Sequence, residues 1–245
     1  MILEVCVDSL ESAVYADKGG ADRIELCADL KLGGTTPSIG LAKLVREYVS
    51  CDVYAMIRPR DGDFAYNEHE TLTMKEDIAE LMPYVDGFVF GALKYEGVLD
   101  INVMSELIAL TGEKGVTVHR AFDCTIDIYK AYDELKELGV DRVLTAGGYN
   151  KAYEGIKVIQ KLVEMEGPTV MAGCGINSEN VREIIEATGV TEVHLSAAST
   201  RSTKMRYQNP ALKMGSDSDE SSIRYCNIEK VKKMKSVLSN DKPPA

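Results

Sequence analysis

The feature that most constrains this chain is an alternation, repeated eight times, between a short apolar run and a longer amphipathic stretch. The short runs have the length of β-strands and lie at residues 2–7, 22–26, 53–58, 87–90, 116–120, 142–145, 169–172 and 192–195. The other stretches carry apolar residues at helical spacing and lie at residues 10–18, 39–49, 68–82, 101–112, 126–138, 152–164, 178–188 and 228–238. Eight such units in 245 residues predict an α/β fold, a single closed (β/α)8 TIM barrel.

An open, doubly wound sheet is the rival architecture. It would carry a GxGxxG turn after its first strand, whereas this chain continues with Cys-Val-Asp-Ser-Leu-Glu. We therefore expect three regions: a barrel core at residues 1–200, a long loop without clear periodicity at 201–226, and residues 227–245, a C-terminal helix that completes the barrel and a short tail.

Composition disfavours several classes of partner. The chain has 39 acidic and 28 basic residues and a net charge of −11, so its surface should repel nucleic acid. No apolar run approaches the ~18 residues that span a bilayer, and the N-terminus does not resemble a secretion signal. We therefore expect a cytoplasmic protein with no membrane partner. Its six cysteines include no CxxC pair and should be reduced thiols.

Alternation within the strands divides their side chains into two sets, because barrel strands face the interior and the helix layer in turn. The apolar set belongs under the helices, so the polar set should face the barrel axis near its C-terminal mouth. The candidate catalytic residues are Glu4, Glu25, Arg58, His119, Asp123 and His194, where Asp123 follows the fifth strand. The alternative to a functional site is a structural network in which these groups pair with one another. Buried charges are costly without a use, so we favour a functional pocket in which His119 or a carboxylate moves a proton and Arg58 orients an anion.

The loops after the seventh and eighth strands are rich in small residues. Gly173 and Gly175 lie in MAGCGIN, and Ser196 lies in HLSAAS. Loops at these two positions commonly bind phosphate in this fold, so these three residues are candidates for an anion or phosphate site. The alternative is that small residues only let the turns close.

Two thiols end the first two strands and should both face the barrel interior. Neighbouring strands lie ~4.8 Å apart, so Cys6 and Cys27 are candidate ligands of one metal ion. Two thiolates suit Cu(I), which is soft. The alternative is that each cysteine packs as a small apolar side chain. No organic cofactor is indicated.

Several motifs together resemble the CutC copper homeostasis family. They are EVCVDSLESAVYADKGGADRIELCADLKLGGTTPSIGL, MIRPRDGDFAY, DGFVFGAL, VTVHRAFD, RVLTAGG, MAGCGIN and EVHLSAAS, and they span residues 1–203. The resemblance implies a cytoplasmic TIM barrel that handles copper, often as a homodimer or larger homo-oligomer. It also implies that the cysteines of EVCVDS and IELC, here Cys6 and Cys27, bind Cu(I).

The resemblance and the polar residues predict different activities. A copper carrier needs accessible soft ligands, whereas the acids, imidazoles and arginine around them are typical of an enzyme. We therefore expect a CutC-like protein that binds Cu(I) through thiolates at the barrel mouth. The alternative is a TIM-barrel enzyme acting on a small anionic or phosphorylated metabolite by Glu/His/Arg chemistry.

Overall fold

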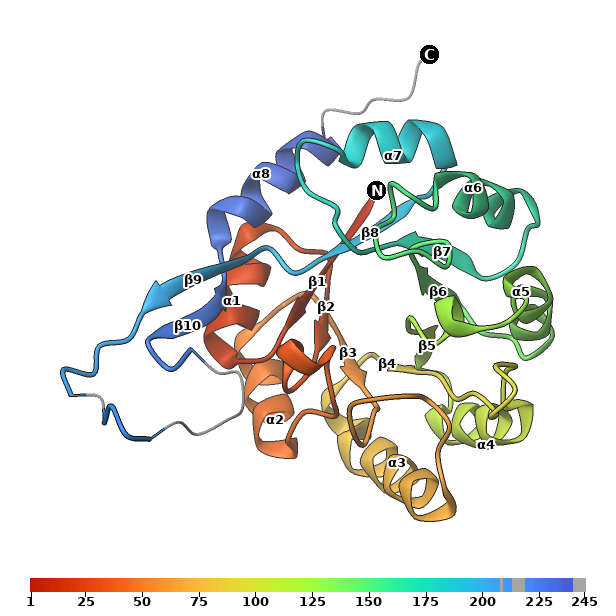
Figure 1. Cartoon of the computed structure of the whole chain (residues 1–245), viewed down its shortest axis with the longest axis horizontal. Helices are drawn as coiled ribbons and strands as arrows, with labels where there is room; N and C mark the ends of the chain where they lie inside the picture. The colour runs from red at the N-terminus through yellow and green to blue at the C-terminus, as the bar shows by residue number, and fades with distance from the viewer. Residues whose placement is uncertain (208, 213–218, 240–245) are drawn as a thin grey trace.

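The computed structural model describes residues 1–207, 209–212 and 219–239. Eight parallel strands close into a barrel, because the first strand pairs with both the second and the eighth (Figure 1). The strands are β1 (Ile2–Val7), β2 (Arg23–Leu26), β3 (Asp52–Met56), β4 (Gly87–Phe90), β5 (Gly115–Val118), β6 (Arg142–Thr145), β7 (Thr169–Ala172) and β8 (Glu192–Leu195). The (β/α)8 prediction is confirmed.

In the described residues, eight α-helices are present, and they surround the barrel (Figure 1). They are α1 (Leu10–Gly19), α2 (Ile39–Tyr48), α3 (Glu68–Leu81), α4 (Ile101–Thr111), α5 (Ile128–Glu137), α6 (Ile156–Glu164), α7 (Val181–Thr188) and α8 (Ile228–Ser239). Helices α1 to α5 each start at a side chain that accepts a hydrogen bond from the first turn. Asn67 accepts hydrogen bonds from two backbone N–H groups of α3, and Glu70 accepts one from the Asn67 N–H, which completes a capping box.

Three short 3-10 helices lie in the loops: η1 (Leu30–Leu32), η2 (Met82–Tyr84) and η3 (Phe122–Cys124). Strands β3 and β5 end earlier than expected, at Met56 and Val118. Arg58 and His119 therefore lie just beyond the strand ends, at the mouth of the barrel.

The two faces of the strands separate as the alternation predicts. Leu3, Val5, Ile24 and Leu26 are fully buried in the large apolar core between strands and helices. A small second cluster of apolar side chains lies apart from that core and consists of Cys27, Tyr54, Met56 and Val89. The polar set therefore lines the barrel interior instead of the helix layer.

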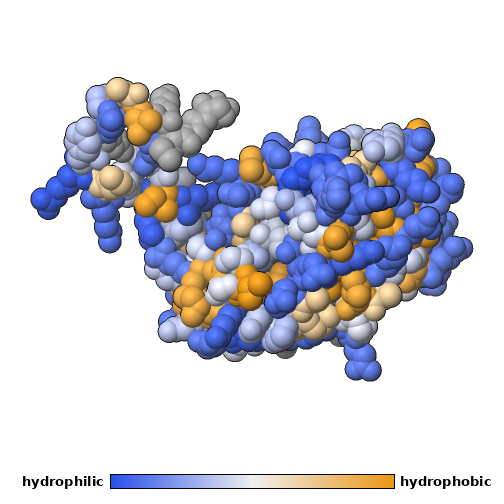
Figure 2. All heavy atoms as spheres, turned by 90° about the horizontal axis from the view of Figure 1, so that it is seen from below, coloured by the Kyte–Doolittle hydropathy of each residue, from blue (hydrophilic) through white to orange (hydrophobic). Residues whose placement is uncertain are grey.

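The segment expected as a long loop, 201–226, has more structure than its composition indicates. Its two ends form antiparallel strands, β9 (Ala198–Ser202) and β10 (Ser222–Cys226). Tyr225 of β10 contacts Tyr15 of α1 edge-on, with ring centroids 6.5 Å apart. The pairing extends from the barrel as an arm (Figures 1 and 2). Local periodicity missed it because each strand is short and finds its partner about twenty residues away.

The predicted long loop and C-terminal tail include residues 208, 213–218 and 240–245, which lie outside the described residues. Among the helices that are described, none is long and apolar enough to cross a bilayer.

Candidate functional site at the barrel mouth

Ionic side chains fill the lower part of the barrel interior, toward the N-terminal ends of the strands. Arg23 forms ion pairs with Glu4 and Glu192, and all three are buried. Arg142 donates from Nε to Glu192 Oε2 at 2.5 Å. Both guanidinium groups lie over the Tyr54 ring, 5.0 and 5.5 Å from its centroid. Every charge in this layer therefore has an opposite charge beside it.

Glu4 belongs to this paired layer, although we expected it among the catalytic groups. Its burial alone would raise the pKa, but the hydrogen bond with His194 and the charge of Arg23 outweigh burial and lower the pKa to about 2. Glu4 is therefore held as a carboxylate. Arg23, Arg142 and Glu192 are not among the residues predicted from the sequence, although Arg23 and Glu192 occupy the same face of their strands as Glu25 and His194.

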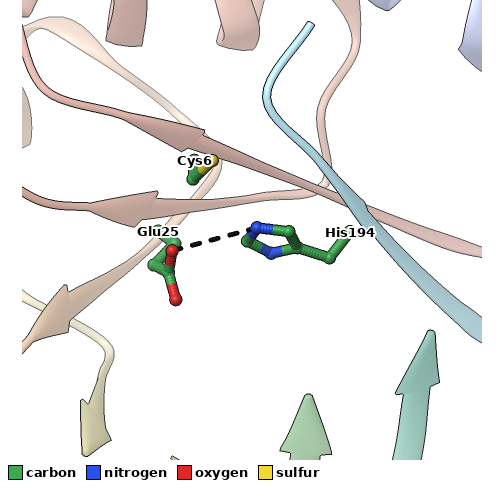
Figure 3. A group of neighbouring side chains, drawn as sticks. All are labelled: Cys6, Glu25 and His194. Carbon is green, nitrogen blue, oxygen red and sulfur yellow. Dashed lines mark ion pairs between the residues drawn. The ribbon is translucent and has the colours of Figure 1, made fainter. Parts of the chain in front are cut away.

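A thiol, a carboxylate and an imidazole meet above that layer. Cys6, Glu25 and His194 offer ligand atoms that all lie within 4.8 Å of one another, and they come from β1, β2 and β8 (Figure 3). Barrel register brings them together, because Cys6 lies opposite Glu25. His194 Nδ1 is 2.8 Å from Glu4 Oε1, and Nε2 is 3.9 Å from Glu25 Oε2. Glu4 therefore orients the ring so that Nε2 faces the group.

The charges around this group favour the protonated, positively charged form of the His194 imidazole. Burial opposes the charge on His194, but Cys6, Glu25 and Glu4 raise its pKa well above the usual range. Burial raises the pKa of Glu25 to about 6, with the charge of Glu4 adding to the rise and that of His194 opposing it. A carboxyl group with such a pKa changes protonation close to neutral pH.

Cys27 lies diagonally from Cys6 and does not face it directly across the two strands. Its N–H donates to the carbonyl of Val7, one residue beyond Cys6. The Cys27 sulfur lies 3.6 Å from Glu25 Oε2 and is fully buried. Burial and the charge of Glu25 raise the pKa of this thiol well above its usual range. The structure therefore places Cys27 beside the group of three, without including it.

A cavity of about 290 Å³ opens next to Glu25. Glu25, Arg58 and His119 line it, and each side chain is at least 95% buried. Each also keeps one buried polar atom without a hydrogen-bond partner among the described residues: Glu25 Oε1, Arg58 Nε and His119 Nε2. Such groups are costly to bury unpaired. We call this cavity the inner cavity.

Arg58, which we expected to orient an anion, donates most of its hydrogen bonds to the protein itself. Its Nη1 donates to the carbonyls of Leu32 and Gly34, and its Nη2 donates to that of Gly62. The guanidinium therefore holds two loops of the mouth in place, and its Nε is a buried donor without a partner among the described residues.

His119 presents a defined tautomer. Its Nδ1 accepts a hydrogen bond from the Ala121 N–H at 3.2 Å, so a neutral ring carries its proton on Nε2. Burial, helped by the charge of Arg58, lowers its pKa to about 3. His119 is thus a neutral hydrogen-bond donor across the physiological pH range.

A larger hollow of about 580 Å³, the outer cavity, lies beside the inner one. Gly175 and Ser196 line it, as the predicted anion site requires, together with Lys230 and Lys233 of α8, which the sequence analysis did not single out. Gly173 has a packing role, because a Cβ there would lie 2.5 Å from Leu144 Cδ1.

Asp123 does not join the other predicted residues. Its carboxylate accepts hydrogen bonds from Thr145 Oγ1 and from the N–H groups of Ala146 and Gly148, and it forms an ion pair with Arg120. All of its acceptor capacity is used to shape the loop after β6. Asp123 is therefore a structural residue in this arrangement.

Cys174 is a further mouth residue that sequence reasoning did not single out for a role. It lines both cavities, and its sulfur accepts from Arg120 Nη1 at 2.9 Å. Its φ of 72° lies in the left-handed region, which favours glycine. The sequence signal for this position was a single non-glycine residue between two glycines, Gly173 and Gly175.

Comparison with known proteins identifies the relationship. Residues 1–199 match the CutC family. The human "Copper homeostasis protein cutC homolog" is 43% identical over 244 residues, which covers 98% of this chain and 89% of that protein. The chain belongs to the CutC family. A CutC family protein of Aliivibrio fischeri is 43% identical over 239 residues, 95% of this chain and 97% of that protein.

A solved CutC structure supports the same conclusion. The protein from Streptococcus agalactiae has 35% identity and a TM-score of 0.76, and it covers 79% of this chain and 97% of that chain. The CutC family match includes Cys6, Glu25, His119 and His194. By contrast, β10 and α8 lie outside the residues 1–199 that match the family, although the match to the human relative covers 98% of this chain.

Proposed function

We propose that this CutC protein binds Cu(I) at the barrel mouth as part of copper homeostasis, with the ion as its cargo. The observation that carries the proposal is the convergence of Cys6, Glu25 and His194 within 4.8 Å. A thiolate and a neutral imidazole nitrogen are both good ligands of Cu(I), while a carboxylate is a poor one. Binding of the ion would therefore displace the proton that the raised pKa keeps on His194 in the metal-free protein. The proposed first ligands are therefore Cys6 Sγ and His194 Nε2.

Cys27 is proposed as the next ligand, in keeping with its place in the IELC motif. Its sulfur lies 3.6 Å from Glu25 Oε2. If the Glu25 carboxyl group moved aside, the Cys27 thiol would take its place as a ligand of the ion. The proposed location is the cytoplasm, where thiols are kept reduced. A homo-oligomer is proposed from the family resemblance alone.

Competition with a colorimetric Cu(I) chelator tests the proposal. We expect Cys6→Ser and His194→Gln each to weaken Cu(I) binding by about tenfold or more, because each removes a first ligand. Cys27→Ser should have a smaller effect. Cys51→Ser is the matched control, since that half-buried thiol lies before β3 at the opposite end of the barrel. Unchanged affinity in Cys6→Ser would overturn the assignment.

A second candidate function is acid–base catalysis on a small anionic metabolite. The observation in its favour is the neighbourhood of a carboxyl group with a pKa of about 6, Glu25, and a neutral imidazole donor, His119, in one cavity. Titratable groups with pKa values pushed apart are typical of enzyme sites. A thermal-shift screen of metabolites on the metal-free protein tests this candidate, since a ligand of the native state raises the melting temperature.

A further inference from the structure

The charge of the inner cavity is opposite to that of the whole protein. Three arginines line it, Arg58, Arg120 and Arg224, together with the neutral imidazole of His119 and with His194, whose Nδ1 lies 2.8 Å from Glu4 Oε1. Among the described residues that line it, Glu25 is the single carboxylate, in a chain whose net charge is −11. A cavity that concentrates positive charge on an acidic protein selects anions, because it focuses the field toward the opening.

Most of these cations are already committed to other protein groups. Arg58 donates to loop carbonyls. Arg120 uses Nε for Asp123, Nη1 for the Cys174 sulfur and Nη2 for the Tyr149 carbonyl. Neither guanidinium can turn toward a ligand without breaking the loops it supports.

Arg224 is the exception. It lies in β10, opposite Thr200 of β9, and it is half-buried where it lines the inner cavity. Within the described part of the chain its side chain forms no hydrogen bond and no ion pair. Its neighbour on the arm, Arg201, is by contrast held by Glu11 at 2.7 Å.

The buried atoms without partners show what kind of ligand would complete the cavity. Arg58 Nε and His119 Nε2 are both N–H donors, and each belongs to a side chain at least 95% buried. They require acceptor oxygens. Glu25 Oε1 is the one unpartnered carboxyl oxygen there, and it pairs with a hydroxyl group or, when protonated, with a further acceptor.

We propose that Arg224 is the anion-recognition residue of the inner cavity, and that the ligand is a small organic oxyanion with a neighbouring carbonyl or hydroxyl oxygen. Arg224 binds the carboxylate or phosphate group, and the buried donors bind the second oxygen. The volume of about 290 Å³ restricts the ligand to a few carbon atoms, while the outer cavity shares Cys6, Cys174 and His194 and accepts a longer tail. This inference deepens the second candidate function, acid–base catalysis. It rests on that function for what happens to the bound ligand, whereas binding of the ligand does not depend on it.

Calorimetry and thermal shift on the metal-free full chain test the proposal at constant ionic strength. The probes are inorganic phosphate, pyruvate and ribose 5-phosphate, which separate a phosphate group from a carboxylate. We expect at least one organic probe to bind more tightly than inorganic phosphate, and Arg224→Gln to weaken that binding by about tenfold or more. Arg224→Lys should restore part of it, because the charge is kept.

Arg201→Gln is the control for damage to the arm, since it removes an arginine from β9 that does not line the inner cavity. Equal weakening by Arg201→Gln and Arg224→Gln would overturn a direct role for Arg224. The absence of binding by all three probes to the unmodified protein would overturn the ligand class. Cu(I) competition, measured on the same variants, should be unchanged in Arg224→Gln, so failure of the copper proposal is recognised separately. Binding without turnover of any probe would count against catalysis alone.

Discussion

The two ends of the barrel interior use the same residue types in opposite ways. At the N-terminal end, Glu4, Arg23, Glu192 and Arg142 form a chain of ion pairs in which every charge is compensated. At the C-terminal mouth, Glu25, Arg58 and His119 each retain an unpartnered polar atom. The comparison teaches that buried charge alone does not mark a functional site. The distinguishing property is incomplete pairing, which leaves interactions for a ligand to make.

Breaking the ion-pair network at the N-terminal end of the barrel interior should give the largest change in stability. Arg23→Met removes the partner shared by Glu4 and Glu192, which leaves both carboxylates poorly compensated in the barrel interior. We expect the free energy of unfolding in urea to fall by about 3–5 kcal/mol. Lys161→Met is the matched control, because its pair with Glu164 is exposed, and it should change stability by no more than ~1 kcal/mol. Similar changes in the free energy of unfolding for the two variants would show that the ion-pair network at the N-terminal end is not essential to the fold.

A Glu→Gln substitution should change the free energy of unfolding in opposite directions at the two ends of the barrel interior. The pKa of Glu4 is lowered to about 2, so its carboxylate stabilises the fold above pH 4.5 and this contribution is lost as the pH falls toward 2. Glu4→Gln should therefore destabilise the protein by about 3 kcal/mol at pH 8. The pKa of Glu25 is raised from 4.5 to about 6, so this group lowers stability as the pH rises through that interval, and the loss is complete above it. Glu25→Gln should stabilise the protein by about 1–2 kcal/mol at pH 8.

Unfolding curves at pH 8 and pH 4 check this pair of variants. The gain in Glu25→Gln should disappear at pH 4, where the native carboxyl group is already protonated. A loss of stability in both variants at pH 8 would remove the contrast between the two ends.

His119 should make the mouth sensitive to acid. Its pKa is lowered from 6.5 to about 3 by burial and by Arg58, so the native state keeps it neutral while the unfolded chain binds a proton. Stability is therefore lost as the pH falls from 6.5 toward 3, by about 1.4 kcal/mol per pH unit for this one group. His119→Gln should flatten that part of the profile and leave the profile above pH 7 unchanged in shape. An identical slope in both proteins between pH 6 and 4 would contradict the assigned burial of a neutral ring.

The smallest effect concerns backbone strain at the mouth. Cys174 has a φ of 72°, a conformation that glycine adopts more easily. Cys174→Gly should raise the free energy of unfolding by a few tenths to about 1 kcal/mol, after the greater flexibility of unfolded glycine is subtracted. Urea titration measures it, and Cys51→Gly is the control because φ is not positive there. A loss of stability at Cys174 would mean that its contact with Arg120 outweighs the strain.

Much of the architecture follows from local sequence patterns. The eightfold alternation predicts the barrel, and the parity of Leu3, Val5, Ile24 and Leu26 correctly predicts which face lies under the helices. The CutC motifs predict the family. These inferences succeed because helix and strand periods, caps and glycine stops depend on neighbours a few residues away.

The details of the site depended on contacts that no local pattern contains. The stagger between β1 and β2 sets Cys6 opposite Glu25 instead of Cys27. Two of the three carbonyls that accept from Arg58, those of Leu32 and Gly34, come from the loop after β2 and so are not contained in the sequence around Arg58. Asp123 is occupied in the same way by the loop after β6. Arg224 reaches the cavity from an arm whose strands pair across about twenty residues.

The sequence by itself determined the eight strand–helix units, the inward parity of the acids, thiols and imidazoles, and the family. Only the tertiary structure decided which of those groups are already satisfied and which remain open. The physical reason is that parity is a property of one strand, whereas the pairing of a charge depends on strand register and on loops distant in the chain.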